Sequence, residues 1–282
     1  MHTERSATTG DGRKLTYVVT GSGPLLVCHP GGPGYDGGSL EDLGGLANDR
    51  TLVLVDPAGA GGSDPWTEDA YSLARRADDV DDVRKALGVE RVDYLGHSGG
   101  GFVGICFAAR YPAGVGKLVL VGTIARFTDA FRAESGRQTV LSASEPWFPD
   151  AHDAHSRRLA RDYADDAEFQ YLYRKGLPFM FARFGEREQA YVERRPAAMI
   201  DRRTLESFND HIESLDLRPD LPRIEAETLL VNGEHEPQRA GEQELLDGIP
   251  NARLAIVEDA GHFPFVEQPE RFRATVLPFL NS

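Results

Sequence analysis

The chain has 282 residues, of which 40% are hydrophobic, and a formal net charge of -14 at pH 7. This hydrophobic content is sufficient for a folded core, and the length suits one large α/β domain or two ordinary domains. The negative charge argues against a nucleic-acid partner, because no basic stripe is present. The expected partner is a small molecule or short peptide, and this charge mildly favours neutral or cationic substrates over anionic ones.

No window approaches 18 uninterrupted apolar residues, and residues 1–6 lack the apolar core of a signal peptide. Cys28 and Cys106 lie in apolar stretches, so we interpret them as reduced core residues and not as a disulfide or metal ligands. We expect a cytoplasmic protein without a membrane segment, metal or cofactor. The oligomeric state stays open.

The first part of the chain predicts a β-hairpin over residues 7–20, with a turn at residues 8–12. Two short apolar runs follow, at residues 25–28 and 51–55, and both are typical of strands buried on two faces. Apolar residues then recur at helical spacing between residues 71 and 87, and Gly88 ends the predicted helix.

Residues 92–97 predict another strand, residues 102–110 a helix, and residues 117–122 a further strand. Strands that alternate with helices indicate βαβ units and a mostly parallel sheet, so the predicted fold class is α/β. The pattern resumes late in the chain with strands at residues 228–233 and 252–257 and a closing helix at residues 269–280.

Between these two parts the sequence is charged, aromatic and helix-like, with no short strand pattern. An insertion of this size between sheet strands is typical of a helical cap and not of a long loop. We therefore predict an α/β core from residues 1–123 and 218–282, with a helical cap from residues 124–217.

A Gly-x-Ser-x-Gly pentad, Gly96 to Gly100, joins a predicted strand to a predicted helix. A sharp turn at this place exposes the Ser98 side chain, and glycines on both sides avoid crowding by Cβ atoms. Ser98 is therefore the candidate nucleophile, and the backbone N–H of Gly99 is a candidate oxyanion donor. The pentad alone would also suit an ordinary glycine-rich turn.

The candidate base is His262, which follows the strand at residues 252–257 and so lies at the same sheet edge as Ser98. The candidate acid lies between Ser98 and His262 in chain order, after the strand at residues 228–233. Both Glu234 and Glu236 occupy that place, and we favour Glu236 because it lies farther from the strand and Pro237 restricts the turn after it.

The second oxyanion donor is expected in the loop at residues 29–34, which contains three glycines and two prolines. Gly32 is the first choice and Gly31 the alternative. His29 is expected to brace this loop and to take no part in chemistry. Residues 56–63 are expected to order the neighbouring strand-to-helix turn.

With these motifs the chain resembles the α/β-hydrolase fold superfamily over nearly its whole length, and it is most similar to prolyl aminopeptidases (proline iminopeptidases). The resemblance rests on Gly31-Gly32-Pro33-Gly34 after His29, on residues 56–63, and on Ala260-Gly261-His262-Phe263. It implies a mostly parallel central sheet with flanking helices and an inserted helical cap.

Four residues depart from the aminopeptidase pattern. Pro30 is inserted before the glycines, Ala58 stands in the place of an arginine, Gly99 in that of a tryptophan, and Glu236 in that of an aspartate. The serine hydrolase interpretation is unaffected by these changes. They weaken the expectation of strict N-terminal proline release.

The resemblance implies a serine hydrolase that cleaves an amide or ester bond through an acyl-enzyme, with prolyl aminopeptidase-like activity. Cap carboxylates hold the free amine of the substrate in that family, and Glu206, Asp210 and Glu213 are the candidates here. Solvated helix charges are the ordinary alternative for these three. An esterase or lactonase acting on a small acyl compound, or a ligand-binding homologue with little turnover, are the alternative functions.

Overall fold

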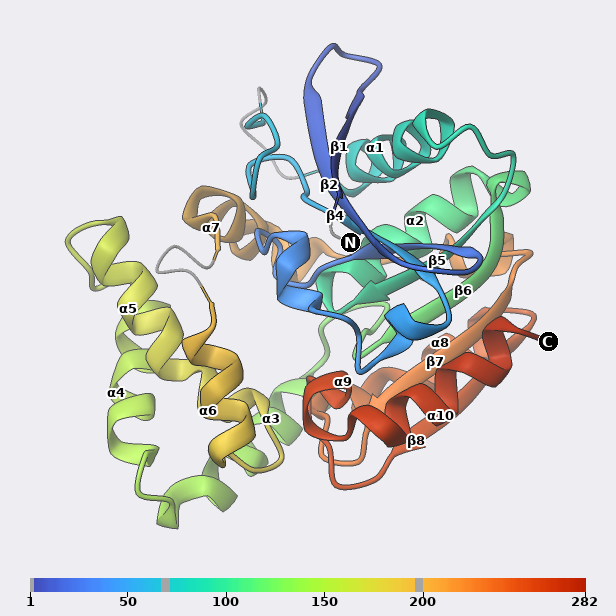
Figure 1. The fold of residues 1–282 in the computed structure, drawn as a ribbon. Helices are drawn as coiled ribbons and strands as arrows, with labels where there is room; N and C mark the ends of the chain where they lie inside the picture. Colours follow the sequence, from blue (N-terminus) through green and yellow to red (C-terminus); the bar gives the residue numbers. More distant parts are fainter. Residues whose placement is uncertain (1–2, 67–71, 196–199) are drawn as a thin grey trace.

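A computed structural model describes residues 3–66, 72–195 and 200–282 (Figure 1). The described residues contain an eight-stranded sheet with the order β1-β2-β4-β3-β5-β6-β7-β8. Strands β3 to β8 pair in parallel, whereas β2 pairs antiparallel with both β1 and β4. The strands are β1 (Thr3–Thr8), β2 (Lys14–Gly21), β3 (Leu25–His29), β4 (Thr51–Val55), β5 (Val92–His97), β6 (Val115–Val121), β7 (Glu227–Gly233) and β8 (Ala252–Val257).

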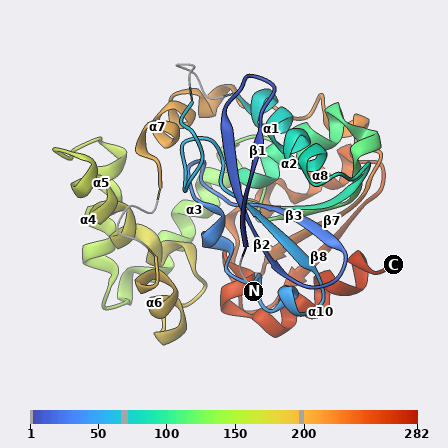
Figure 2. The same ribbon diagram turned by 45° about the horizontal axis from the view of Figure 1, so that its top comes forward.

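Helices cover both faces of this sheet (Figure 2). Helices α1 (Leu73–Ala86), α2 (Gly99–Arg110) and α8 (Glu242–Gly248) pack on one face, and α9 (Pro264–Glu267) and α10 (Pro269–Leu280) pack on the other. Residues of β4 alternate between the two cores, with Val53 and Val55 in the first and Leu52 and Leu54 in the second. The predicted α/β class is confirmed.

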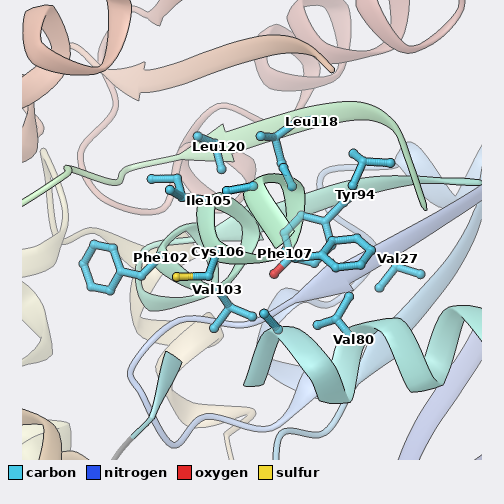
Figure 3. Close-up of a cluster of buried hydrophobic side chains, with 14 of the residues drawn as sticks. Val27, Val80, Tyr94, Phe102, Val103, Ile105, Cys106, Phe107, Leu118 and Leu120 are labelled. Carbon is cyan, nitrogen blue, oxygen red and sulfur yellow. The ribbon is translucent and has the colours of Figure 1, made fainter. Parts of the chain in front are cut away.

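The core beneath α2 supports the turn between β5 and α2 (Figure 3). Tyr94 lies in this core next to Phe107, and its hydroxyl donates a hydrogen bond of 2.8 Å to the carbonyl of Gly100. A Cβ atom at Gly104 would lie 2.5 Å from the Tyr94 ring, so glycine lets α2 pack directly on this side chain. The ring thereby holds the start of α2 against the sheet.

Between β6 and β7 the chain forms five α-helices among the described residues, and α4, α5 and α6 lie to one side of the sheet (Figures 1 and 2). These helices are α3 (Asp129–Leu141), α4 (Phe148–Leu159), α5 (Asp166–Gly176), α6 (Glu186–Glu193) and α7 (Arg202–His211). The 3-10 helix η5 (Leu177–Met180) directly follows α5 and precedes α6 in the chain. The division into two domains at residues 124 and 217 stays a prediction.

The largest corrections to the predicted boundaries are at two places. The hairpin begins at Thr3 and not at residue 7, because β1 is a mostly exposed edge strand without alternating apolar residues. Helix α2 begins at Gly99 and not at residue 102, since its three leading glycines are helical. The predicted start of α1 at residue 71 lies outside the described residues, and α1 itself begins at Leu73.

Candidate functional site

Ser98 lies at the turn from β5 into α2, with φ 52° and ψ -117°. A serine rarely adopts positive φ, and its persistence requires support from the surrounding structure. Its backbone N–H donates to the Val121 carbonyl at 2.7 Å, and its carbonyl accepts from the Gly101 N–H at 2.8 Å and from the Thr123 hydroxyl at 2.9 Å. These bonds to α2 and to the end of β6 hold the strained turn.

The two glycines of the pentad are sterically required. A Cβ atom at Gly96 would lie 2.3 Å from the Gly100 carbonyl oxygen, and a Cβ atom at Gly100 would lie 2.3 Å from the His29 carbonyl oxygen. Either contact is far inside van der Waals distance. The turn at Ser98 can therefore pack against the end of β3 only with glycine at both positions.

His262 and Glu236 form a direct pair, with 2.6 Å between Nδ1 of the imidazole and Oε2 of the carboxylate. Both side chains are buried, at 10% and 2% exposure. The second carboxylate oxygen of Glu236 accepts a hydrogen bond of 3.0 Å from the backbone N–H of Gln238. The carboxylate thus holds the imidazole proton on Nδ1 and leaves Nε2 as the acceptor.

The other candidate acid, Glu234, does not contact His262. Its carboxylate accepts from the Asp259 N–H at 3.1 Å, and its side chain is 47% exposed. The two glutamates lie only two residues apart, and the turn that follows β7 directs Glu236 inward. Sequence alone could favour Glu236 only through its greater distance from the strand and the position of Pro237.

Ser98, Glu236 and His262 lie together at one end of the sheet, where each is in contact with Gly122 or with its neighbour Val121. A Cβ atom at Gly122 would lie 3.1 Å from both Glu236 Oε2 and His262 Nδ1. Gly122 directly follows Val121, whose carbonyl binds the Ser98 N–H. Within the described parts of the chain, no hydrogen bond joins the Ser98 hydroxyl to His262, and such bonds often form only once a substrate is bound.

The glycine loop after β3 packs directly on the turn at Ser98. A Cβ atom at Gly31 would lie 3.1 Å from the Ser98 Cβ, and one at Gly99 would lie 2.7 Å from the Gly32 carbonyl oxygen. The backbone N–H groups of Gly31, Gly32 and Gly99 donate to no protein acceptor within the described residues. Three donors that could bind an oxyanion are therefore available beside Ser98.

Two buried histidines brace this site. His29 places Nδ1 3.0 Å from the Pro30 carbonyl oxygen, and burial lowers the pKa of its imidazole to about 3. Burial and the neighbouring His262 lower the pKa of His97 well below its usual range, so its ring is neutral. Nε2 of His97 therefore donates to the His262 carbonyl oxygen at 2.7 Å.

Sequence analysis missed three residues that position His262: His97, Met180 and Glu267. His97 donates to the carbonyl of His262, and the Met180 carbonyl accepts from the N–H of His262 at 2.8 Å. Glu267 accepts from the N–H groups on both sides of His262. The only sequence signal was the closeness of His97 to Ser98 and of Glu267 to His262.

The three cap carboxylates that sequence analysis singled out are each paired with an arginine. Glu206 contacts Arg202 at 3.4 Å and also accepts from the Tyr163 hydroxyl, Asp210 pairs with Arg161, and Glu213 pairs with Arg132 at 2.6 Å. The side chains of Asp210 and Glu213 are 54% and 76% exposed. None of the three makes a hydrogen bond or ion pair with a residue of the site within the described part of the chain.

The remaining expectations concern cysteines, metals and membranes. Cys28 and Cys106 are buried free thiols. In residues 3–66, 72–195 and 200–282, no group of three or more His, Cys, Asp or Glu side chains could hold a metal ion. No helix in these ranges has the length and apolar character needed to cross a membrane.

The family described as alpha/beta hydrolase fold matches residues 24–269, which includes Ser98, Glu236 and His262. The chain belongs to this family. A proline iminopeptidase of Heyndrickxia coagulans is 25% identical, over 93% of this chain and 92% of its own length. A putative carbamate hydrolase of Pseudomonas savastanoi pv. phaseolicola is 27% identical, over 92% of this chain and 94% of its own length.

Among solved structures of α/β hydrolases, the proline iminopeptidase of Mycobacterium smegmatis superposes with a TM-score of 0.67. It is 23% identical, and the match covers 99% of this chain and 98% of that one. This likeness supports the fold, and the predicted resemblance to α/β hydrolases that include proline iminopeptidases is confirmed.

Proposed function

We propose that the protein is a serine hydrolase that cleaves a carbonyl compound through an acyl-enzyme on Ser98. The Ser98 hydroxyl gives its proton to Nε2 of His262 while its oxygen attacks the substrate carbonyl carbon. Glu236 stabilises the resulting imidazolium and keeps its orientation. The N–H of Gly99, together with that of Gly32 or Gly31, stabilises the negative oxygen of the tetrahedral intermediate.

The rest of the cycle returns every group to its starting state. His262 passes the proton to the leaving group as the carbon–leaving-group bond breaks, which leaves an ester on Ser98. A water molecule then gives a proton to His262 and attacks the ester, and the proton returns to Ser98 as the acid product leaves. The net reaction consumes one water molecule for each bond cleaved.

The observation that carries this proposal is the buried bond of 2.6 Å between His262 and Glu236 beside a strained serine. A buried carboxylate whose main partner is a histidine is an arrangement that orients a general base. The Ser98 backbone is held at positive φ by bonds to two other elements, which is costly unless the partly exposed side chain has a use.

For the substrate, we infer a neutral acyl compound, such as a small ester, lactone or carbamate. The cap carboxylates Glu206, Asp210 and Glu213 are already neutralised by arginines, so none offers an unpaired charge to a substrate ammonium. The relative described as a carbamate hydrolase is consistent with this inference.

Aminopeptidase activity is the second candidate. It is favoured by the glycine-proline loop beside Ser98 and by the 25% identical proline iminopeptidase that matches along nearly its whole length. A substrate ammonium would then have to displace an arginine from a cap carboxylate. A ligand-binding protein with little turnover is a third outcome that kinetics can reveal.

The central test is Ser98→Ala, which removes the nucleophile and leaves the packing of the turn unchanged. We expect kcat to fall by about 10⁶-fold on any substrate that the wild type turns over. Ser144→Ala, at an exposed serine of the cap, should keep full activity. Retention of a tenth of the wild-type rate by S98A would exclude the acyl-enzyme at this residue.

The substrate class is tested with matched aryl compounds: a neutral acyl ester, a free aminoacyl arylamide and its N-acetylated twin. The inference of a neutral acyl substrate predicts that the ester is cleaved fastest and that N-acetylation does not slow the arylamide. A preference of about tenfold or more for the free amine is the size expected of one charged hydrogen bond and would support the aminopeptidase candidate.

A further inference from the structure

A segment of the cap lies directly on the loop that carries His262. We call Met180, Phe181 and Ala182 the cap segment, and residues 260–263 the histidine loop. A Cβ atom at Gly261 would lie 2.7 Å from the Ala182 nitrogen and 2.9 Å from the Met180 carbonyl oxygen, so the two backbones are in close contact. The rings of Phe181 and Phe263 stack with centroids 5.2 Å apart.

Glu267 binds both of these segments with one carboxylate. Its Oε2 accepts from the Ala182 N–H at 2.7 Å, and its Oε1 accepts from the Gly261 N–H at 2.9 Å and from the Phe263 N–H at 3.3 Å. The residue is 7% exposed. The hydrogen-bond partners of its carboxylate among the described residues are all backbone N–H groups, so its role is set by the two segments that it joins.

The backbone of His262 is thereby held from two sides. Its N–H donates to the cap segment through the Met180 carbonyl at 2.8 Å, and its carbonyl accepts from His97 of β5 at 2.7 Å. A displacement of the cap segment would remove the first of these bonds and the Phe181–Phe263 stack together. The histidine loop would then keep only its contacts with the core.

We propose that Glu267 is a positioning residue that couples the seating of the cap segment to the alignment of His262. This inference rests on the proposed function in one respect, which is the role of His262 as the base for Ser98. The Glu267 carboxylate bonds to backbone N–H groups and not to the side chains of Ser98 or His262. It acts by tying Ala182 of the cap to Gly261 and Phe263, the neighbours of His262 in the chain.

Glu267→Gln separates the two halves of this bridge. The amide oxygen can still accept from Gly261 and Phe263, but the amide NH₂ then faces the Ala182 N–H and cannot accept from it. Glu270→Gln is the matched control, because it makes the same Glu-to-Gln change at an exposed glutamate three residues further along the chain. The cap connection is therefore broken selectively.

Two measurements test the proposal. Amide hydrogen exchange followed by NMR should show Ala182 exchanging about tenfold faster in E267Q, the size expected for one lost hydrogen bond, with Gly261 within about twofold of wild type. The number of active sites is determined by titrating Ser98 with an organophosphonate, and turnover is expressed per titrated site. In E267Q, kcat should then fall about tenfold while KM stays within about twofold of wild type, because His262 is misaligned and the binding site is retained. E270Q should match the wild type in both.

Unchanged exchange at Ala182 would overturn the bridge itself, and faster exchange with an unchanged kcat would overturn the coupling to His262. If E267Q does not fold, Glu267→Asp shortens the carboxylate by one methylene, and the same rise in Ala182 exchange and fall in kcat is expected. Activity that survives in S98A would instead contradict the proposed function, while the exchange measurement would still test the bridge.

Discussion

At the residue scale, the site depends on positions where one atom decides the geometry. Ser98 tolerates positive φ because Gly96 and Gly100 leave room for the backbone around it. Gly99 faces the Gly32 carbonyl oxygen so closely that a tryptophan there would push the glycine loop away. The departure from the aminopeptidase pattern at Gly99 is therefore matched by the close packing of this loop.

The two candidate acids should respond differently to loss of charge. Glu236→Gln is expected to lower kcat by several orders of magnitude, because the amide no longer holds the His262 tautomer; about 10⁴-fold is typical of such changes. Glu234→Gln should change kcat by less than about threefold, since an exposed side chain away from His262 contributes little. Steady-state kinetics on one ester decides between them, and the reverse ranking would move the acid to Glu234.

A methyl group at Gly122 should disturb the pair formed by Glu236 and His262. In Gly122→Ala the Cβ would lie 3.1 Å from both side chains, so we expect kcat to fall about tenfold or more as the imidazole shifts. Gly88→Ala is the control, because Gly88 also has positive φ, at 72°, but nothing lies within 4 Å of its added Cβ. Both variants should lose about 1–2 kcal/mol of stability from backbone strain, and only G122A should lose activity. Equal kcat in the two variants would contradict this placement.

At the element scale, the parallel strands bring the loops of the site together at their carboxyl ends. Buried contacts near their amino-terminal ends hold the strands in place. Arg50 lies there almost fully buried, at 1% exposure, and it pairs with Asp93 of β5. Its guanidinium also donates to the carbonyls of Leu25 and Leu280 at 3.2 Å each. One side chain thus connects β3, β5 and the end of α10.

Removing this connection should destabilise the whole sheet. Arg50→Met is expected to lower the free energy of unfolding by about 3 kcal/mol, because it leaves Asp93 without its cation in a largely buried place. Arg253→Met, which breaks an exposed pair with Glu227, should cost less than about 1 kcal/mol. Denaturant unfolding monitored by circular dichroism measures both, and similar losses would argue against a structural role for Arg50.

At the scale of the whole molecule, Glu267 makes stability depend on pH in an unusual direction. Burial raises the pKa of its carboxyl to about 8, and repulsion from Glu188 acts in the same direction. The three N–H donors lower this pKa and offset part of the rise. The nearby Arg187 guanidinium donates to the backbone carbonyl of Glu267 and not to its carboxyl group. The folded protein therefore holds this proton more tightly than the unfolded chain, whose glutamate has a pKa near 4.5. This contribution to stability is complete below pH 4.5 and is lost as pH rises through about 8.

Wild type should accordingly lose more stability between pH 5 and pH 8.5 than E267Q does, and E270Q should behave as wild type. Unfolding free energies from urea titrations at the two pH values give the comparison directly. The bridge survives protonation, because the carbonyl oxygen can accept two N–H groups and the hydroxyl oxygen can accept one. Parallel pH profiles for wild type and E267Q would show that Glu267 keeps an ordinary pKa in the folded state.

The sequence by itself determined the α/β class, most of the strands, and the candidates Ser98 and His262. These follow from local patterns: apolar runs, glycines that a tight turn requires, and the rule that parallel strands end at one edge. The same patterns led to the loop that contains Gly31 and Gly32. Each of these features is set within about ten residues of chain, so periodicity and spacing are sufficient to find it.

Only the tertiary structure decided the contacts between distant segments. It paired His262 with Glu236 and left Glu234 exposed, and it placed His97 and Glu267 around the His262 backbone. It also showed that the cap carboxylates are held by arginines up to 81 residues away. Such pairings depend on side-chain direction after the chain has folded, and a hydrogen bond is made or lost within less than 1 Å, which no local pattern specifies.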